Sequence, residues 1–167
     1  MVDDDAILRE AFAQLLNHES WLRVSRQFFS VGVVLAALEE ERPPDIILLD
    51  LNLGNETGLS AIAPIRKLAP TVKVLMLTTF NDTHSEAEAF RLGASGFLLK
   101  LYDIQEIIAL IHEAFYHPED PRLFPNLSFD QRTKKHAVHL EPAPKKRSPF
   151  VTGLRQLFRP RKRQSAA

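Results

Sequence analysis

Through residues 1–116, short apolar runs alternate with segments in which apolar positions recur every three or four residues. A short continuous apolar run is typical of a strand buried on both faces, and the three- or four-residue recurrence is typical of an amphipathic helix. Strands are predicted at 22–28, 46–49, 72–77 and 97–99, after a stub of a first strand formed by Met1 and Val2. Helices are predicted at 7–16, 31–41, 59–68, 84–92 and 104–115. The alternation predicts an α/β domain in which helices cover a parallel sheet.

The charged residues divide the chain into an acidic first part and a basic second part. Residues 1–116 hold 9 Lys and Arg against 17 Asp and Glu, and residues 117–167 hold 12 against 4, so the net charge of zero conceals a balance of −8 and +8. Seven of the 11 prolines follow residue 116, where the apolar periodicity is lost until Val151. We therefore expect a folded domain at 1–116, a largely disordered linker at 117–149 and a basic amphipathic tail at 150–167.

Polar residues stand where the predicted strands end. They are Asp3 and Asp4 after the first stub, Asp50 after 46–49, Thr78 after 72–77 and Lys100 after 97–99. The carboxyl ends of parallel strands meet at one edge of the sheet, where ligands bind in open folds of this class. A single polar residue after a strand is weak evidence, but three carboxylates, a hydroxyl and an amine together suit phosphoryl chemistry.

Clustered carboxylates repel one another and favour a hard divalent cation, for which Mg²⁺ is the natural candidate. We expect Asp4 and Asp50 to bind the ion directly and Asp3 to reach it through water. An ionised carboxylate can also act as a nucleophile and form an acyl phosphate, and Asp50 is the candidate for that role. Lys100 would offset charge on the transferring group, and Thr78 would donate a hydrogen bond to its oxygens.

These residues resemble the response-regulator receiver domain, a family with the CheY-like fold. The resemblance covers 2–116 and lies in the acidic pair after Val2, the loop that contains Asp50 and Gly58, and residues 74–78 and 93–100. It implies a doubly wound (βα)5 flavodoxin-like sheet with the strand order 2-1-3-4-5. The run at 93–100 is most similar to the subfamily with LuxR-type output domains, although residues 117–167 show no helix-turn-helix pattern.

The resemblance also implies roles for particular residues. Asp50 would be the phospho-acceptor, Asn52 would offer its backbone carbonyl to the metal, and Phe97 would be an aromatic switch that turns inward with Thr78. The implied function is that of a phospho-accepting receiver in a two-component phosphorelay, not of an enzyme that turns over a separate substrate. Its partner would be a sensor histidine kinase or a phosphotransfer protein, and the formation of a homodimer stays open.

Three departures from the family pattern limit this transfer of roles. Gly54 and Leu101 stand where many members have proline, so the acceptor loop is expected to be looser and no cis peptide is expected after Lys100. The first strand is also short, because only Met1 and Val2 precede the acidic pair. We therefore expect either residues upstream of Met1 or a receiver with weakened folding and weakened Mg²⁺ binding.

Other interpretations remain for the function and for single residues. A degenerate receiver that serves only as a protein-interaction module would keep the fold without phosphorylation, and a DNA-binding regulator is supported by the basic charge alone. A phosphatase of the haloacid-dehalogenase type is disfavoured, because Asn52 stands where its second acid would be. Asp5 with its two acidic neighbours could be a helix cap on an acidic terminus, Phe97 could be a plain core residue, and His136 and His139 fit solvated histidines better than a metal site.

The predictions for the tail and for the location of the protein are based on residue composition. Apolar residues between Phe150 and Phe158 share a helical face beside five basic residues, which suits an anionic membrane, nucleic acid or an acidic protein surface. A solvated tail without a binding role is an equal alternative; among the binding roles, weak contact with an acidic surface of the body or of a partner is favoured over DNA, because the body is net −8 and the tail net +8. The chain has no cysteine and no apolar run of membrane-spanning length, so a cytoplasmic protein is expected.

Overall fold

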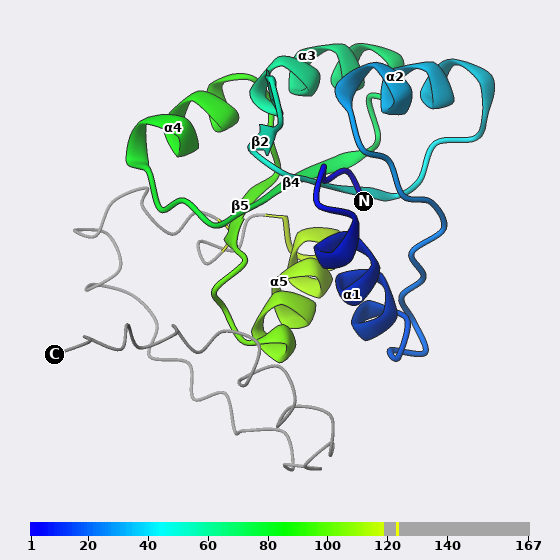
Figure 1. The fold of residues 1–167 in the computed structure, drawn as a ribbon, viewed down its shortest axis with the longest axis vertical. Helices are drawn as coiled ribbons and strands as arrows, with labels where there is room; N and C mark the ends of the chain where they lie inside the picture. The colour runs from blue at the N-terminus through cyan, green and yellow to red at the C-terminus, as the bar shows by residue number, and fades with distance from the viewer. Residues whose placement is uncertain (119–122, 124–167) are drawn as a thin grey trace, which may run out of the picture. The chain divides into compact units, whose positions relative to one another are not determined.

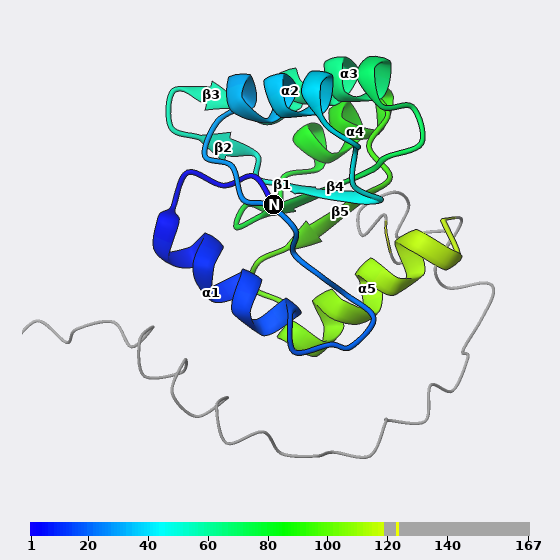
Figure 2. The same ribbon diagram turned by 90° about the vertical axis from the view of Figure 1, so that its right-hand side faces the viewer.

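The computed structural model describes residues 1–118 and residue 123, and in them helices cover both faces of a parallel sheet. The helices are α1 (Ala6–Leu16), α2 (Val31–Glu40), α3 (Leu59–Leu68), α4 (Thr83–Arg91) and α5 (Ile104–Tyr116). The strands are β1 (Ile46–Leu49), β2 (Asn52–Leu53), β3 (Glu56–Thr57), β4 (Lys73–Thr78) and β5 (Gly96–Leu99). Figures 1 and 2 show α2, α3 and α4 on one side of the sheet and α1 with α5 on the other. The predicted α/β class is confirmed.

The sheet has the predicted strand order. β4 lies between β1 and β5, and both pairings are parallel. On the far side of β1, Val2 forms one parallel bridge to Leu49 and another to Phe28. The order across the sheet is therefore Phe28, Val2, β1, β4, β5, which matches 2-1-3-4-5 with its first two positions reduced to single bridges.

The strand predicted at 22–28 does not form, which corrects the sequence-based expectation. Only Phe28 is bridged, and the residues before it are irregular, drawn in Figure 2 as plain coil beside the N-terminus. A strand needs a hydrogen-bonded neighbour along its length. In the sheet, the position between the segment 22–28 and β1 is occupied only by residues 1–3, so the rest of the segment has no neighbouring strand. The backbone N–H of Val24 is instead bound by the side chain of Asn17, at 2.7 Å.

Two local features follow from backbone chemistry. Asp5 caps α1 as expected, since its carboxylate accepts hydrogen bonds from the N–H groups of Ile7 and Leu8 at 2.9 and 3.0 Å. The turn predicted around Gly54 is a short antiparallel hairpin of β2 and β3, and Gly54 has a φ of 65°, which glycine adopts without a steric penalty. The hairpin is fixed to α2, because the Glu56 carboxylate accepts the N–H of Val31 at 3.1 Å.

Alternating residues of the central strands build a core on each face of the sheet. Val74 and Met76 of β4 pack in the layer beneath α2, α3 and α4, while Leu75 and Leu77 pack in the layer with α1 and α5. All four side chains are buried. Their continuous apolar run is therefore explained by burial on both faces, as predicted for a parallel strand.

No helix in the described part of the chain is long and apolar enough to cross a membrane. The predicted linker at 117–149, apart from residues 117, 118 and 123, and the predicted tail at 150–167 lie outside the described residues. Their boundaries and the uses considered for the tail stay predictions.

Candidate functional site

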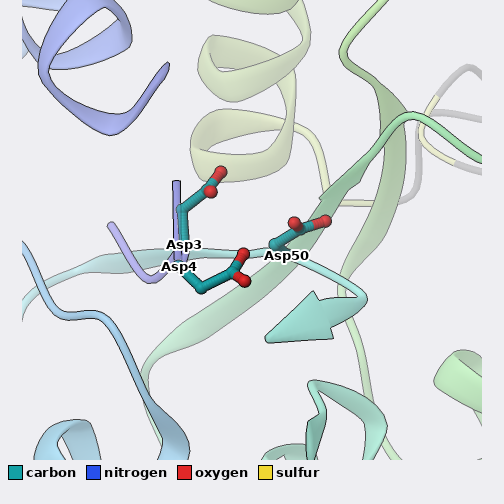
Figure 3. Close-up of side chains that lie close together, drawn as sticks. All are labelled: Asp3, Asp4 and Asp50. Atoms are coloured by element: carbon teal, nitrogen blue, oxygen red, sulfur yellow. The ribbon is translucent and has the colours of Figure 1, made fainter. Parts of the chain in front are cut away.

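Three carboxylates gather at the carboxyl edge of the sheet. Figure 3 shows Asp3 and Asp4 on the N-terminal segment beside Asp50, which directly follows β1. Each residue can offer one oxygen such that all three oxygens lie within 4.8 Å of one another. Asp3 and Asp50 are buried, with exposed fractions of 0% and 7%, whereas Asp4 is exposed. The sequence-predicted acidic cluster is therefore assembled in the structure.

Backbone pairing places the acidic residues. The N–H of Val2 donates to Leu48 O at 2.8 Å, and the N–H of Asp50 donates to Val2 O at 2.9 Å, so the two acidic strand ends stand side by side. The N–H of Asp3 also donates to Phe28 O at 3.0 Å. Arg9, one turn into α1, holds the same segment by donating from Nη1 to Asp3 O at 2.5 Å. Sequence reasoning missed Arg9, because nothing in its spacing distinguishes it from an ordinary helix-surface arginine.

Lys100 supplies a positive charge to this cluster. Its Nζ lies 2.8 Å from Oδ2 of Asp3 and 2.8 Å from Oδ2 of Asp50. The contact with Asp50 has hydrogen-bond geometry. Its backbone N–H donates to Thr78 O at 2.8 Å, which fixes the end of β5 against the end of β4. One ammonium against three carboxylates leaves an excess of negative charge at the edge of the sheet.

The pKa values of the Asp50 carboxyl and the Lys100 ammonium respond to this environment. Burial raises the pKa of Asp50 above its ordinary value, the negative charge of Asp3 adds to the rise, and Lys100 and the Leu51 N–H oppose it. Burial alone would lower the pKa of Lys100, but its bonds and charge interactions with Asp3 and Asp50 outweigh this effect and raise it. Pairing therefore only partly offsets the desolvation of the Asp50 carboxylate, whereas it more than offsets the desolvation of the Lys100 ammonium.

The donor set fits a magnesium ion. Mg²⁺ favours carboxylate oxygens, one or two of them as direct ligands, with water in its remaining positions. Asp4 is open to water, and Oδ2 of Asp3 is buried and receives no hydrogen bond of good geometry from the described residues. Asn52 begins β2, opposite Thr57, and its carbonyl as a further ligand stays a prediction.

Thr78 and Phe97 lie where the sequence placed them, at the end of β4 and inside β5. The Thr78 side chain is buried, and its Oγ1 accepts the N–H of Phe80 at 3.2 Å, so the hydroxyl proton is left to donate elsewhere. Phe97 is fully buried in the core layer beneath α4, opposite Met76. Its position is that of a core residue, and the switch role stays a prediction.

Gly58 packs directly against the backbone of Asp50. It stands at the start of α3, and its N–H donates to Leu51 O at 2.8 Å. A Cβ at this position would lie 2.0 Å from the backbone oxygen of Asp50. The backbone approach, not an unusual φ, therefore explains why glycine fits here.

The known proteins that this chain resembles are response regulators and their receiver domains. The family described as response regulator receiver domain matches residues 1–112. The DNA-binding transcriptional regulator NtrC of Proteus hauseri is 34% identical over 117 residues, which are 70% of this chain and 24% of that protein. The chain spans a quarter to about half of the length of the first curated relatives it matches.

The solved structures that resemble this chain are also response regulators. A LuxR-family two-component response regulator from Aurantimonas sp. SI85-9A1 matches with a TM-score of 0.65 and 29% identity, over 69% of this chain and 81% of that one. A response regulator from Burkholderia pseudomallei, with a phosphorylated aspartic acid, a calcium ion and citrate, matches with a TM-score of 0.59 and 28% identity, over 72% of each chain. The predicted similarity to receivers of the LuxR type is confirmed.

Proposed function

The chain belongs to the response regulator receiver domain family of two-component systems, and from this membership we propose that Asp50 accepts a phosphoryl group with the help of Mg²⁺. The observation that supports the proposal best is the contact between the Lys100 ammonium and the Asp50 carboxylate, at 2.8 Å, inside the cluster formed with Asp3 and Asp4. The Burkholderia relative, with its phosphorylated aspartic acid and bound calcium ion, adds support by similarity.

The transfer is a displacement at phosphorus. One carboxylate oxygen of Asp50 forms a bond to phosphorus, and the bond between phosphorus and the nitrogen of a donor phosphohistidine breaks, with its electron pair left on that nitrogen. No general base is needed, because the nucleophile has no proton to lose when it is ionised. A bound Mg²⁺ would offset negative charge on the phosphoryl oxygens.

The protein groups around Asp50 would hold the phosphoryl group. The Lys100 ammonium is placed to pair with a phosphoryl oxygen once that oxygen replaces the Asp50 carboxylate as its partner. The Thr78 hydroxyl, which accepts from Phe80, keeps its proton for a second such oxygen. Asp4 and Asp50 would hold the metal directly and Asp3 through water. By family resemblance, the Asn52 backbone carbonyl would be a further metal ligand and Phe97 would be the aromatic switch.

The proposed donor is a sensor histidine kinase or a phosphotransfer protein, and the proposed location is the cytoplasm. Four exposed apolar side chains lie at the start of α1 or directly after Phe28, β4 and β5, and we expect the donor to contact them. They are Ile7, Phe29, Phe80 and Leu101.

The test is mass spectrometry after incubation with Mg²⁺ and acetyl phosphate. The native chain is expected to gain one phosphoryl group, and Asp50→Asn is expected to gain none. Glu40→Gln, which removes an exposed charge at the end of α2, serves as the matched control and should label like the native chain. Labelling of Asp50→Asn at the native level would exclude Asp50 as the acceptor, and no labelling of the native chain would refute the proposed function.

A further inference from the structure

The peptide bond between Asp3 and Asp4 lies where the chain leaves the sheet. The last ladder bond of this segment is the one from the N–H of Asp3 to Phe28 O, and no backbone N–H of the described residues donates to Asp3 O. That oxygen accepts from Nη1 of Arg9 at 2.5 Å instead. A peptide unit is planar, so a hydrogen bond to the oxygen of Asp3 also restrains the Cα of Asp4.

The two carboxylates on either side of this peptide are held to different degrees. Asp3 is buried, its Oδ1 accepts the N–H of Asp5 at 3.0 Å, and its Oδ2 lies 2.8 Å from Nζ of Lys100. Asp4 is exposed, and in the described part of the chain its carboxylate has no hydrogen bond and no ion pair. The place of the Asp4 carboxylate beside Asp50, shown in Figure 3, therefore depends on the backbone that carries it.

The orientation of Arg9 suits the restraint of that backbone. Side chains of a helix tilt toward its N-terminus, so an arginine one turn into α1 reaches back to the residues before Ala6. Nε of Arg9 is buried without a hydrogen-bond partner among the described residues, a cost that a side chain turned to water would avoid. Arg9 also forms no ion pair with a described carboxylate. Its contact with Asp3 O is thus a directed hydrogen bond to the backbone and not a pairing of charges.

We propose that Arg9 is a positioning residue for the metal site, which orients the peptide after Asp3 so that the Asp4 carboxylate meets the geometry that Mg²⁺ requires. The inference rests on the proposed binding of Mg²⁺ beside Asp50 and adds to it a residue outside the ligand set. Mg²⁺ requires near-ideal octahedral geometry, whereas Ca²⁺ accepts flexible arrangements of its ligands. Arg9 therefore favours Mg²⁺ over Ca²⁺ at this site.

The charge of Arg9 alone predicts the opposite effect on metal affinity. A guanidinium near a cation site repels the cation, so removal of that charge would strengthen the binding of Mg²⁺ and Ca²⁺ alike. Removal of the hydrogen bond to Asp3 O would instead loosen the peptide and weaken the binding of Mg²⁺ most. The sign of the change and its dependence on the ion separate a positioning role from an electrostatic one.

The experiment is calorimetric titration of the native chain and of Arg9→Met with Mg²⁺ and, separately, with Ca²⁺. Methionine keeps a long apolar side chain and a high helix propensity but has no donor for Asp3 O. The dissociation constant of Arg9→Met for Mg²⁺ should rise about tenfold or more, as for other groups that orient metal ligands, and that for Ca²⁺ by less than about threefold. Arg23→Met, which removes an exposed arginine far from the acidic pair in sequence, is the matched control and should keep both constants within about twofold of the native values.

Three results would overturn the proposal: unchanged or tighter binding of Mg²⁺ by Arg9→Met, equal weakening for the two ions, or weakening of the same size in Arg23→Met. Tighter binding would assign Arg9 an electrostatic effect, and equal weakening would assign it a general structural one. If Arg9→Met does not fold, as judged by circular dichroism, Arg9→Gln decides by the same criteria. Its amide lies on a shorter side chain and does not reach Asp3 O.

Titration and labelling of the native chain separate this proposal from the proposed function. If the native chain binds Mg²⁺ but gains no phosphoryl group from acetyl phosphate, the proposed phosphorylation is wrong and the comparison with Arg9→Met still decides. If the native chain binds no Mg²⁺, both proposals are wrong. If the native chain binds Mg²⁺ and is labelled while Arg9→Met keeps the native ratio of the two dissociation constants, only the role of Arg9 is wrong.

Discussion

Removal of the Asp50 charge should make the metal-free protein more stable. At an effective dielectric constant of 20, the attraction of Asp50 to Lys100 at 2.8 Å amounts to about 6 kcal/mol. The repulsion from each of Asp3 and Asp4, at no more than 4.8 Å, amounts to at least about 3.5 kcal/mol before solvent screens the share of the exposed Asp4. The charge interactions therefore nearly cancel, and the cost of burying the carboxylate decides the balance.

The raised pKa of Asp50 gives the direction of that balance. A carboxyl whose pKa is higher in the folded protein than its ordinary 3.8 stabilises the fold when protonated, and this contribution is lost as pH rises through the folded value. At pH 7 without metal, Asp50→Asn should therefore unfold with a free energy about 1–2 kcal/mol higher than the native chain. The difference should shrink as pH falls toward 4.

Thermal unfolding followed by circular dichroism measures this effect. In EDTA, Asp50→Asn should melt about 5 °C above the native chain. With Mg²⁺ at about one hundred times its dissociation constant, the native chain should gain roughly 2.7 kcal/mol and the variant much less, so the order of the two melting temperatures should reverse. Glu40→Gln should stay within about 0.5 kcal/mol of the native chain in both buffers. An Asn variant that melts at or below the native chain in EDTA would refute this electrostatic reasoning.

Three further substitutions test single contacts. Gly58→Ala should lower the free energy of unfolding by about 2–4 kcal/mol, because its Cβ would lie 2.0 Å from Asp50 O, whereas Gly32→Ala in the open part of α2 should raise it by about 0.5–1 kcal/mol in a denaturant titration. Lys100→Ala should keep Mg²⁺ binding, measured by calorimetry, but weaken the conformational response to acetyl phosphate, and an unchanged response would count against its role. Asp82→Ala, which removes the cap of α4, should cost about 1 kcal/mol, and no loss would show that the cap is not used.

Much of the fold could be predicted because its strongest patterns are local. The run at 46–49 is continuous and apolar, the run at 72–77 is interrupted only by Lys73, and the strands β1 and β4 form there, buried on two faces. The segment at 22–28 alternates apolar and polar residues except at Arg26, yet only Phe28 forms a β-bridge. Alternation of apolar and polar residues indicates which face of a segment would be buried. A strand also needs a neighbouring strand with free backbone groups, and that neighbour comes from another part of the sequence.

The acidic cluster could be predicted for a related reason. Parallel strands bring their carboxyl ends to one edge, so the order of residues along the chain is enough to place Asp50 and Lys100 together. The contributions of Arg9, which binds a backbone oxygen of Asp3, and of Glu56, which binds the N–H of Val31, depend on how a helix and a hairpin approach the sheet. Such approaches are set by packing, and spacing along the chain carries no signal for them.

The shortness of the first strand and the integrity of the acidic cluster are compatible because of where the backbone bonds fall. Met1 donates to Arg26 O, but the other backbone bonds of residues 1–3 go to Phe28, Leu48 and Asp50, next to the carboxylates that must be held. Val2 alone, bonded to both Leu48 and Asp50, is therefore enough to hold Asp3 beside Asp50.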